Sequence, residues 1–102
     1  MNSVKYDEGK RDYTLLPINE LEQVLDVLEF GAKKYGVKNA WKNVENGKER
    51  YNRALLRHII EYEKGNDIDE ESNMKHLAHA VCNILFILYF ERIEKNENWF
   101  KK

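Results

Sequence analysis

The stretch HLAHAVCNILFILYF, residues 76–90, decides how this chain must fold. Its last part, from Ile84 to Phe90, is apolar at every position, so a helix built from it has no face suited to water. We predict a helix that starts near Ser72 and continues past Phe90. Three helices of this size cannot cover such a segment from all sides, because a small domain leaves much of its surface wet. We therefore expect a homo-oligomer that covers it.

Two more helices are predicted upstream. The first starts after Pro17, with Asn19 as cap and Glu22 three residues on, and runs to about Tyr35. Its apolar stripe has helical spacing, and Gly36 is placed to end it. The stripe consists of Ile18, Leu21, Leu25 and Leu28, widened by Val24 and Val27.

The second helix is predicted from about Glu49 to Lys64, and Gly65 is placed to end it. Residues 1–16 read as an irregular arm, and residues 37–48 as a loop anchored by Trp41. In the charged tail, Trp99 and Phe100 either close an oligomer contact or pack back on the chain. The residues expected to face inward from the second helix are Tyr51, Leu55, Ile59 and Tyr62.

These elements predict a single all-α domain over residues 1–102. It is a small bundle of three main helices with an irregular N-terminal arm, completed by oligomerisation. The sequence has no internal repeat and no β-type alternation long enough to require a sheet.

Composition and charge limit the classes of partner that the protein can attract. The 102 residues carry 17 basic and 18 acidic side chains, a formal net charge of -1, so no global field draws the protein to nucleic acid or a membrane surface. The run from Ile84 to Phe90 is far shorter than the ~20 residues of a membrane span. The one cysteine, Cys82, cannot form an internal disulfide. We expect a cytoplasmic protein.

Chemically capable side chains gather in the second half of the chain. His76, His79 and Asn83 share one helical face, and His58 lies one turn from Glu61. Imidazoles and a carboxylate in this arrangement suit proton transfer, so His58, Glu61 and His79 are the predicted catalytic residues. The alternative for each histidine is a structural hydrogen bond.

An acidic loop precedes the third helix. Asp69 and Glu71, with Glu61 from the second helix, offer oxygen ligands that suit a divalent cation. The alternative is that Asp69 or Ser72 caps the third helix and the other acids complement its N-terminal dipole.

Basic and aromatic residues suit a nucleotide. Arg57 and Lys34 can bind phosphate oxygens, and aromatic rings can stack on a base. The alternatives are an Arg57–Glu61 ion pair and aromatic residues that belong to the core. The predicted substrate-binding residues are Lys34, Tyr35, Trp41, Arg57, His76 and Asn83.

A set of motifs in fixed order resembles one phage-encoded family, the N-terminal domain of dATP/dGTP diphosphohydrolase, which is related to the all-α MazG-like pyrophosphohydrolases. The resemblance covers about Lys5 to Leu88. The motifs are KYDEGK at 5–10, LLP at 15–17, FGAKKYG at 30–36, NAW at 39–41, YNRALLRH at 51–58, Gly65, DEES at 69–72 and HLAHAVCN at 76–83.

The resemblance implies binding of a purine deoxynucleoside triphosphate and Mg²⁺-dependent cleavage to the monophosphate and pyrophosphate. The MazG-like relatives hold magnesium with a Glu-x-x-Glu pair and a Glu-x-x-Asp pair, and this chain has no such tetrad. It also has Asn73 where the family commonly has Gly, and Ala40 before Trp41 where it commonly has Asn.

Three hypotheses follow. The first is a magnesium-dependent diphosphohydrolase of dATP or dGTP. The second is a non-catalytic phage sponge that sequesters a nucleotide signal of host anti-phage defence, a task that needs basic and aromatic contacts but no metal-activated water. The third is a structural helix bundle whose polar residues are caps and core hydrogen bonds.

Overall fold

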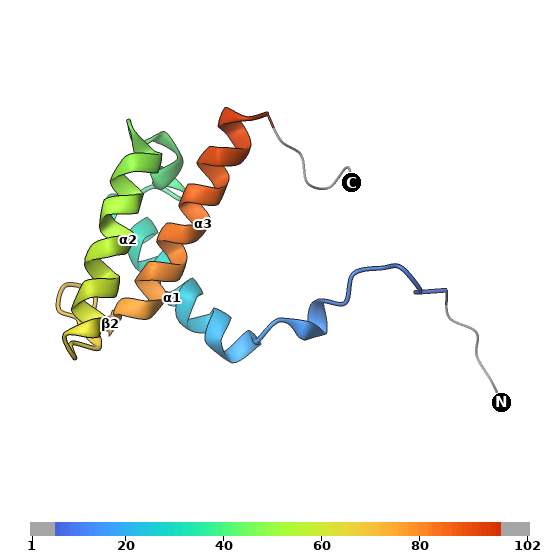
Figure 1. Ribbon diagram of the computed structural model, residues 1–102, viewed down its shortest axis with the longest axis horizontal. Coiled ribbons are helices and arrows are strands. Elements are labelled where there is room, and N and C mark those ends of the chain that lie inside the picture. Colours follow the sequence, from blue (N-terminus) through green and yellow to red (C-terminus); the bar gives the residue numbers. More distant parts are fainter. Residues whose placement is uncertain (1–5, 97–102) are drawn as a thin grey trace.

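Three α-helices, α1 (Ile18–Tyr35), α2 (Gly47–Glu63) and α3 (His76–Glu94), form the body of the computed structural model, which describes residues 6–96 (Figure 1). Two short 3-10 helices, η1 (Tyr13–Leu15) and η2 (Ala40–Asn43), precede α1 and α2. The predicted all-α class is confirmed, with one addition: a small antiparallel hairpin of β1 (Ile68–Asp69) and β2 (Met74–Lys75) connects α2 to α3.

The start of α1 differs from the prediction. Pro17 occupies the cap position, Asn19 lies inside the first turn, and no side chain caps the helix. Its end is as predicted, because Gly36 adopts the left-handed backbone with φ 71° that favours glycine. Residues 6–17, which precede α1, are exposed and lead away from the helices as an arm (Figure 1).

Helix α2 begins two residues earlier than predicted, at Gly47, and ends at Glu63. Tyr51 packs inward against Phe86 and Phe90, as expected. Tyr62 does not face inward, since 40% of it is exposed. It lies in the last turn of α2, beyond the aromatic residues of α3.

Helix α3 begins at His76 rather than near Ser72, because residues 68–75 form the hairpin. Asp69 accepts hydrogen bonds from the backbone N–H and the hydroxyl of Ser72 inside this hairpin. Neither residue caps α3, so that reading is wrong. Instead, the backbone N–H of His76 donates to the carbonyl of Asp67 at 2.9 Å, which joins the first residue of α3 to the start of the hairpin.

Two packed regions hold the helices together. A small core joins α1 to α3 through Val24, Val27, Ala78 and Cys82. Burial raises the pKa of the Cys82 thiol to about 12, which keeps it protonated as a small core residue.

The second packed region is an aromatic cluster between α2 and α3. Trp41 stacks on Phe86 at 4.3 Å between centroids and meets the edges of Tyr89 and Phe90. The predicted anchoring role of Trp41 is therefore confirmed.

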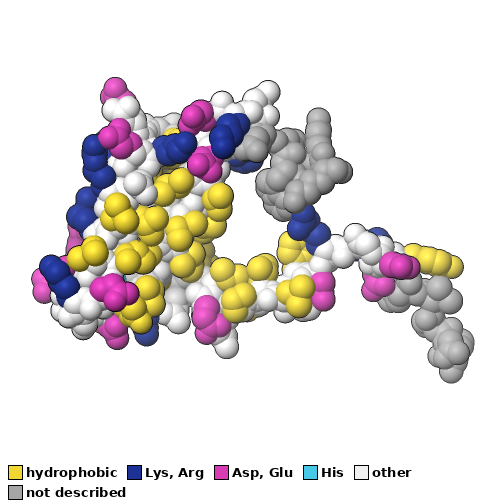
Figure 2. All heavy atoms as spheres, in the orientation of Figure 1, with side chains coloured by type: hydrophobic (Ala, Val, Ile, Leu, Met, Phe, Trp, Pro, Cys, Tyr) yellow, Lys and Arg dark blue, Asp and Glu magenta, His cyan; other side chains and the backbone are white. Residues whose placement is uncertain are grey.

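One face of α3 has no cover among residues 6–96. Leucine, isoleucine and valine side chains between 38% and 55% exposed follow it at helical spacing, and Figure 2 shows hydrophobic side chains gathered over α2 and α3. Length and composition alone would also let α3 cross a membrane, a test that core helices pass too. The expectation of no membrane partner stays a prediction, and the contacts predicted for Trp99 and Phe100 lie outside the described residues. The exposed residues are Leu77, Val81, Ile84, Leu85 and Leu88.

Gly47 is required for close approach of α2 to α3. A Cβ atom added there would lie 2.5 Å from the ring of Phe90, whose neighbours in the aromatic cluster limit its movement. We expect Gly47→Ala to lower the free energy of unfolding by about 1–3 kcal/mol, the usual cost of overpacking. Gly31→Ala is the matched control: it has no neighbour within 4 Å, and it should stabilise α1 by about 0.5–1 kcal/mol. Urea denaturation of both variants tests this, and equal effects would contradict it.

Candidate functional site

The three histidines of the chain lie together where α2 meets the start of α3. His58 comes from α2, and His76 and His79 come from the first turn of α3. The Nδ1 atoms of His58 and His76 are 2.8 Å apart, and the ring of His79 stacks on that of His58 at 4.6 Å with an interplanar angle of 11°. The hairpin makes this possible because it turns the chain back so that α3 starts beside α2.

Asp69 and Ser72 complete the cluster and fix its protons. The ionised carboxylate of Asp69 only accepts, so the single hydroxyl proton of Ser72 is donated to Asp69 Oδ2 at 2.8 Å. The Ser72 oxygen then accepts from the backbone N–H of Met74 and from Nε2–H of His79, which is 2.7 Å away. His79 therefore carries its proton on Nε2 and is committed to Ser72 through that atom.

The environment keeps His58 and His79 neutral. Burial is the main cause that lowers the pKa of His58 to about 4, and the neighbouring His79 and His76 add to it. Burial also lowers the pKa of His79, although Asp69 opposes this. Burial acts to raise the pKa of Asp69, but the two hydrogen bonds from Ser72, together with the nearby His79 and His58, lower it below its ordinary value. At neutral pH, His58 and His79 are therefore neutral and lie beside the ionised carboxylate of Asp69.

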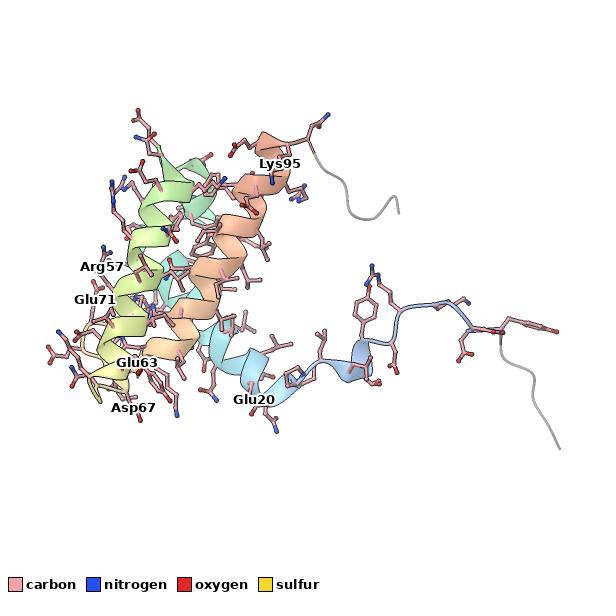
Figure 3. The ribbon with its side chains drawn as sticks, in the orientation of Figure 1. Glu20, Arg57, Glu63, Asp67, Glu71 and Lys95 are labelled. Atoms are coloured by element: carbon pink, nitrogen blue, oxygen red, sulfur yellow. The ribbon has the colours of Figure 1, made fainter. Side chains whose placement is uncertain are left out.

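A pocket of about 420 Å³ opens next to these residues. Figure 3 shows Arg57 and Glu71 at this end of the molecule. Glu61 bonds to Asn66 at 3.2 Å and pairs with Lys64 at 3.5 Å. The pocket is lined by Arg57, His58, Glu61, Asn66, Ile68, Asp69, Glu70, Glu71 and His76.

Arg57 differs from its charged neighbours. The structure of residues 6–96 gives its guanidinium no hydrogen bond and no ion pair, so the Arg57–Glu61 pair considered from the sequence does not form. An unpaired guanidinium on a pocket wall is available to bind an anionic group.

The remaining predicted residues divide between the rim and other parts of the fold. Lys34 pairs with Glu71 at 2.5 Å, which raises the pKa of Lys34, and its ammonium lies 5.3 Å from the ring of Tyr35. Trp41 is packed in the aromatic cluster. Asn83 is buried and donates to the carbonyl of His79 at 2.9 Å. The lining of the pocket includes none of these four residues, and Lys34 reaches it only through its ion pair with Glu71.

The predicted magnesium ligands do not gather into one set. Glu61, Asp69 and Glu71 all line the pocket, but Glu71 is paired with Lys34 and Glu61 with Lys64. Within the described part of the chain, one group of potential ligands lies close enough for a single ion, namely His58, Asp69 and His76, with donor atoms within 4.8 Å of one another. This donor set does not fit a magnesium site made of carboxylates.

A larger depression, of about 760 Å³, lies at the opposite end, between the start of α2 and the end of α3. It is lined by residues such as Gly47, Lys48, Phe90 and Glu94, and none of the three histidines reaches it. We therefore place the candidate site at the histidine cluster, where chemically capable groups converge.

Comparison with known proteins agrees with the motif pattern. Residues 2–99 match the family described as dATP/dGTP diphosphohydrolase, N-terminal. The chain belongs to this family. A protein of Salmonella phage PMBT28 named dATP/dGTP diphosphohydrolase is 38% identical over 89 residues, which cover 87% of this chain. The chain spans about 30% of the length of that relative. No solved structure matches this chain.

Ser72 is the site residue that sequence reasoning missed. The sequence pattern offers Ser72 only as a helix cap, whereas in the structure Ser72 links Asp69 to His79. The spacing of Asp69 and Ser72 already contained the signal, because an Asp side chain commonly bonds the backbone a few residues on within a turn.

The low pKa of His58 predicts a pH dependence of stability. Its folded pKa of about 4 lies below the ordinary value of 6.5, so the unfolded chain binds more protons between these values. Stability should thus be full above pH 6.5 and decline as the pH falls toward 4. In EDTA, His58→Asn should lose less unfolding free energy between pH 7 and pH 5 than the parent. The residual slope should come from His79, and an unchanged slope would refute the assignment to His58.

Proposed function

We propose that this domain binds a purine deoxynucleoside triphosphate at the pocket beside the histidine cluster and takes part in its hydrolysis to the monophosphate and pyrophosphate. The observation that carries the proposal is the unpaired guanidinium of Arg57 on the wall of a pocket that also holds carboxylates and neutral imidazoles. Family membership and the printed name of the phage relative supply the substrate class.

The charge of the pocket limits how a triphosphate can bind. Glu61, Asp69, Glu70 and Glu71 line it, against the single guanidinium of Arg57. A bare polyphosphate would be repelled at such a surface, so we propose that the nucleotide enters as its magnesium complex. The ion is then part of the substrate, and Arg57 contacts a phosphate oxygen not covered by it.

Two groups on α2 suit the hydrolytic step. Arg57 would stabilise charge on the phosphate, and Glu61, one turn further along the same helix, would accept a proton from the attacking water. Glu61 is the better acceptor because its two carboxylate oxygens keep further lone pairs beside the contacts with Asn66 and Lys64, whereas each histidine nitrogen has a single position. His79 Nε2 is engaged with Ser72, and His58 Nδ1 with His76.

A second candidate is supported by a different observation. The predicted carboxylates do not converge on one point, which favours binding over catalysis. In this alternative, the domain is a sponge that holds a nucleotide immune signal of the host without cleaving it. The acidic pocket argues against capture of a bare anion, so we rank this candidate second.

The test is incubation of purified protein with dATP, dGTP and other nucleotides with and without Mg²⁺, followed by chromatography before and after heat release. We expect monophosphate and pyrophosphate from dATP or dGTP. We also expect Arg57→Ala to weaken nucleotide binding at least tenfold, since it removes the charge-assisted contact. Arg53→Ala, one turn earlier and paired with Glu49 at 2.6 Å, is the control that should bind normally.

A nucleotide that is bound and returned intact would instead establish the sponge. No binding of any nucleotide, or equal losses in the Arg57 and Arg53 variants, would refute the site.

We also propose that the chain forms a homo-oligomer through the exposed apolar face of α3. Its side chains repeat at intervals of three and four residues, the spacing of a helix that packs on another helix. Leu88→Lys, at a position 55% exposed, should reduce the mass measured by light scattering. Val37→Lys is the control, because Val37 is equally exposed at 57% but lies in the turn after α1. A parent chain that is monomeric would refute the proposal.

A further inference from the structure

The donor atoms of the histidine cluster converge as metal ligands do. His58 from α2, Asp69 from β1 and His76 from α3 are far apart in the sequence, yet their nearest donor atoms all lie within 4.8 Å of one another. They are also shielded: His76 is 6% exposed, and the side chain of Asp69 is 20% exposed.

The contact between His58 and His76 leaves at least one of the two facing nitrogens without a proton. Their Nδ1 atoms are 2.8 Å apart, so at most one of them carries a proton and the other presents its lone pair. Ligand atoms of a tetrahedral ion bound at about 2.0–2.1 Å lie roughly 3.3 Å apart, so the two nitrogens would separate by about half an ångström to admit an ion. That is a small adjustment of two rings.

Asp69 has an oxygen to contribute. The hydrogen bonds from Ser72 both end on Oδ2, as does the approach of His79 Nε2 at 3.6 Å. In the part of the chain that the structure describes, Oδ1 has no such partner, so Asp69 can bind an ion without breaking the hairpin. Ser72 thereby holds the carboxylate in place, as outer partners of metal ligands do.

We propose that His58, Asp69 and His76 form a binding site for one divalent transition-metal ion of the Zn²⁺ class. Two imidazoles and one carboxylate are the ligands of zinc and its neighbours, whereas Mg²⁺ binds oxygen ligands and keeps its water. Three protein ligands leave one position of a tetrahedral ion open, which is typical of catalytic rather than structural zinc.

His79 is a positioning residue of this site. Its ring lies nearly parallel to that of His58, and Ser72 fixes it from the other side. Any direct role of the ion in nucleotide hydrolysis rests on the proposed function. The metal site itself rests only on the positions of the donor atoms. Its test therefore contains no nucleotide, and either proposal can fail without the other.

The experiment is titration of EDTA-stripped full chain with Zn²⁺ in a calorimeter and with Co²⁺ in a spectrophotometer, each with and without millimolar Mg²⁺. We expect one ion per chain and a visible absorption band typical of Co²⁺ bound by nitrogen and oxygen ligands. Zn²⁺ should displace the Co²⁺, and Mg²⁺ should not. Zn²⁺ should also raise the melting temperature.

The variants separate this site from adventitious binding. His58→Asn and Asp69→Asn should each weaken Zn²⁺ binding at least tenfold, while circular dichroism checks that they fold. Glu70→Gln is the control, because Glu70 is an exposed acid that lines the same pocket without belonging to the ligand set. The absence of a Co²⁺ band in the folded parent, equal displacement by Mg²⁺, or equal weakening by Glu70→Gln would overturn the proposal.

Discussion

The hydrogen bonds from Ser72 to Asp69 are the contact on which the site depends. They close the turn between β1 and β2, and so set the residue at which α3 begins. If α3 began at Ser72, each of its residues would be displaced along the helix axis, and His76 would not meet His58. The same hydroxyl also accepts from His79, so one serine couples the hairpin to the helix that follows it.

Packing elsewhere keeps α2 and α3 in the register that this contact needs. At the far end of the pair, Trp41 and Tyr51 pack on Phe86, and Gly47 lets α2 approach Phe90. The core of α1 and α3 is small, with Cys82 as its most buried side chain. Large aromatic rings therefore supply the contact area that small core residues do not.

The electrostatics of the site differ from those of a simple anion-binding pocket. Carboxylates outnumber cationic groups, and burial keeps His58 and His79 neutral instead of positively charged. Such a surface attracts cations, and it binds phosphates when a cation accompanies them. This is why a magnesium complex of the nucleotide, rather than the free nucleotide, is the substrate form we propose, and why Arg57, the one unpaired cationic group on the wall, carries most weight.

The sequence by itself determined the helical class, the glycine that ends α1, the anchoring by Trp41 and the family, because these depend on local backbone preference, apolar spacing and motif order. It also placed His58, Asp69 and His76 on the list of candidates. Only the tertiary structure decided which candidates meet. The hairpin replaced the first turn of the predicted third helix, with Asp69 and Ser72 bonded to each other inside its turn. It also brought the histidines to Asp69 and left Glu61 and Glu71 with lysine partners. Such choices depend on contacts between residues distant in sequence, which local spacing does not encode.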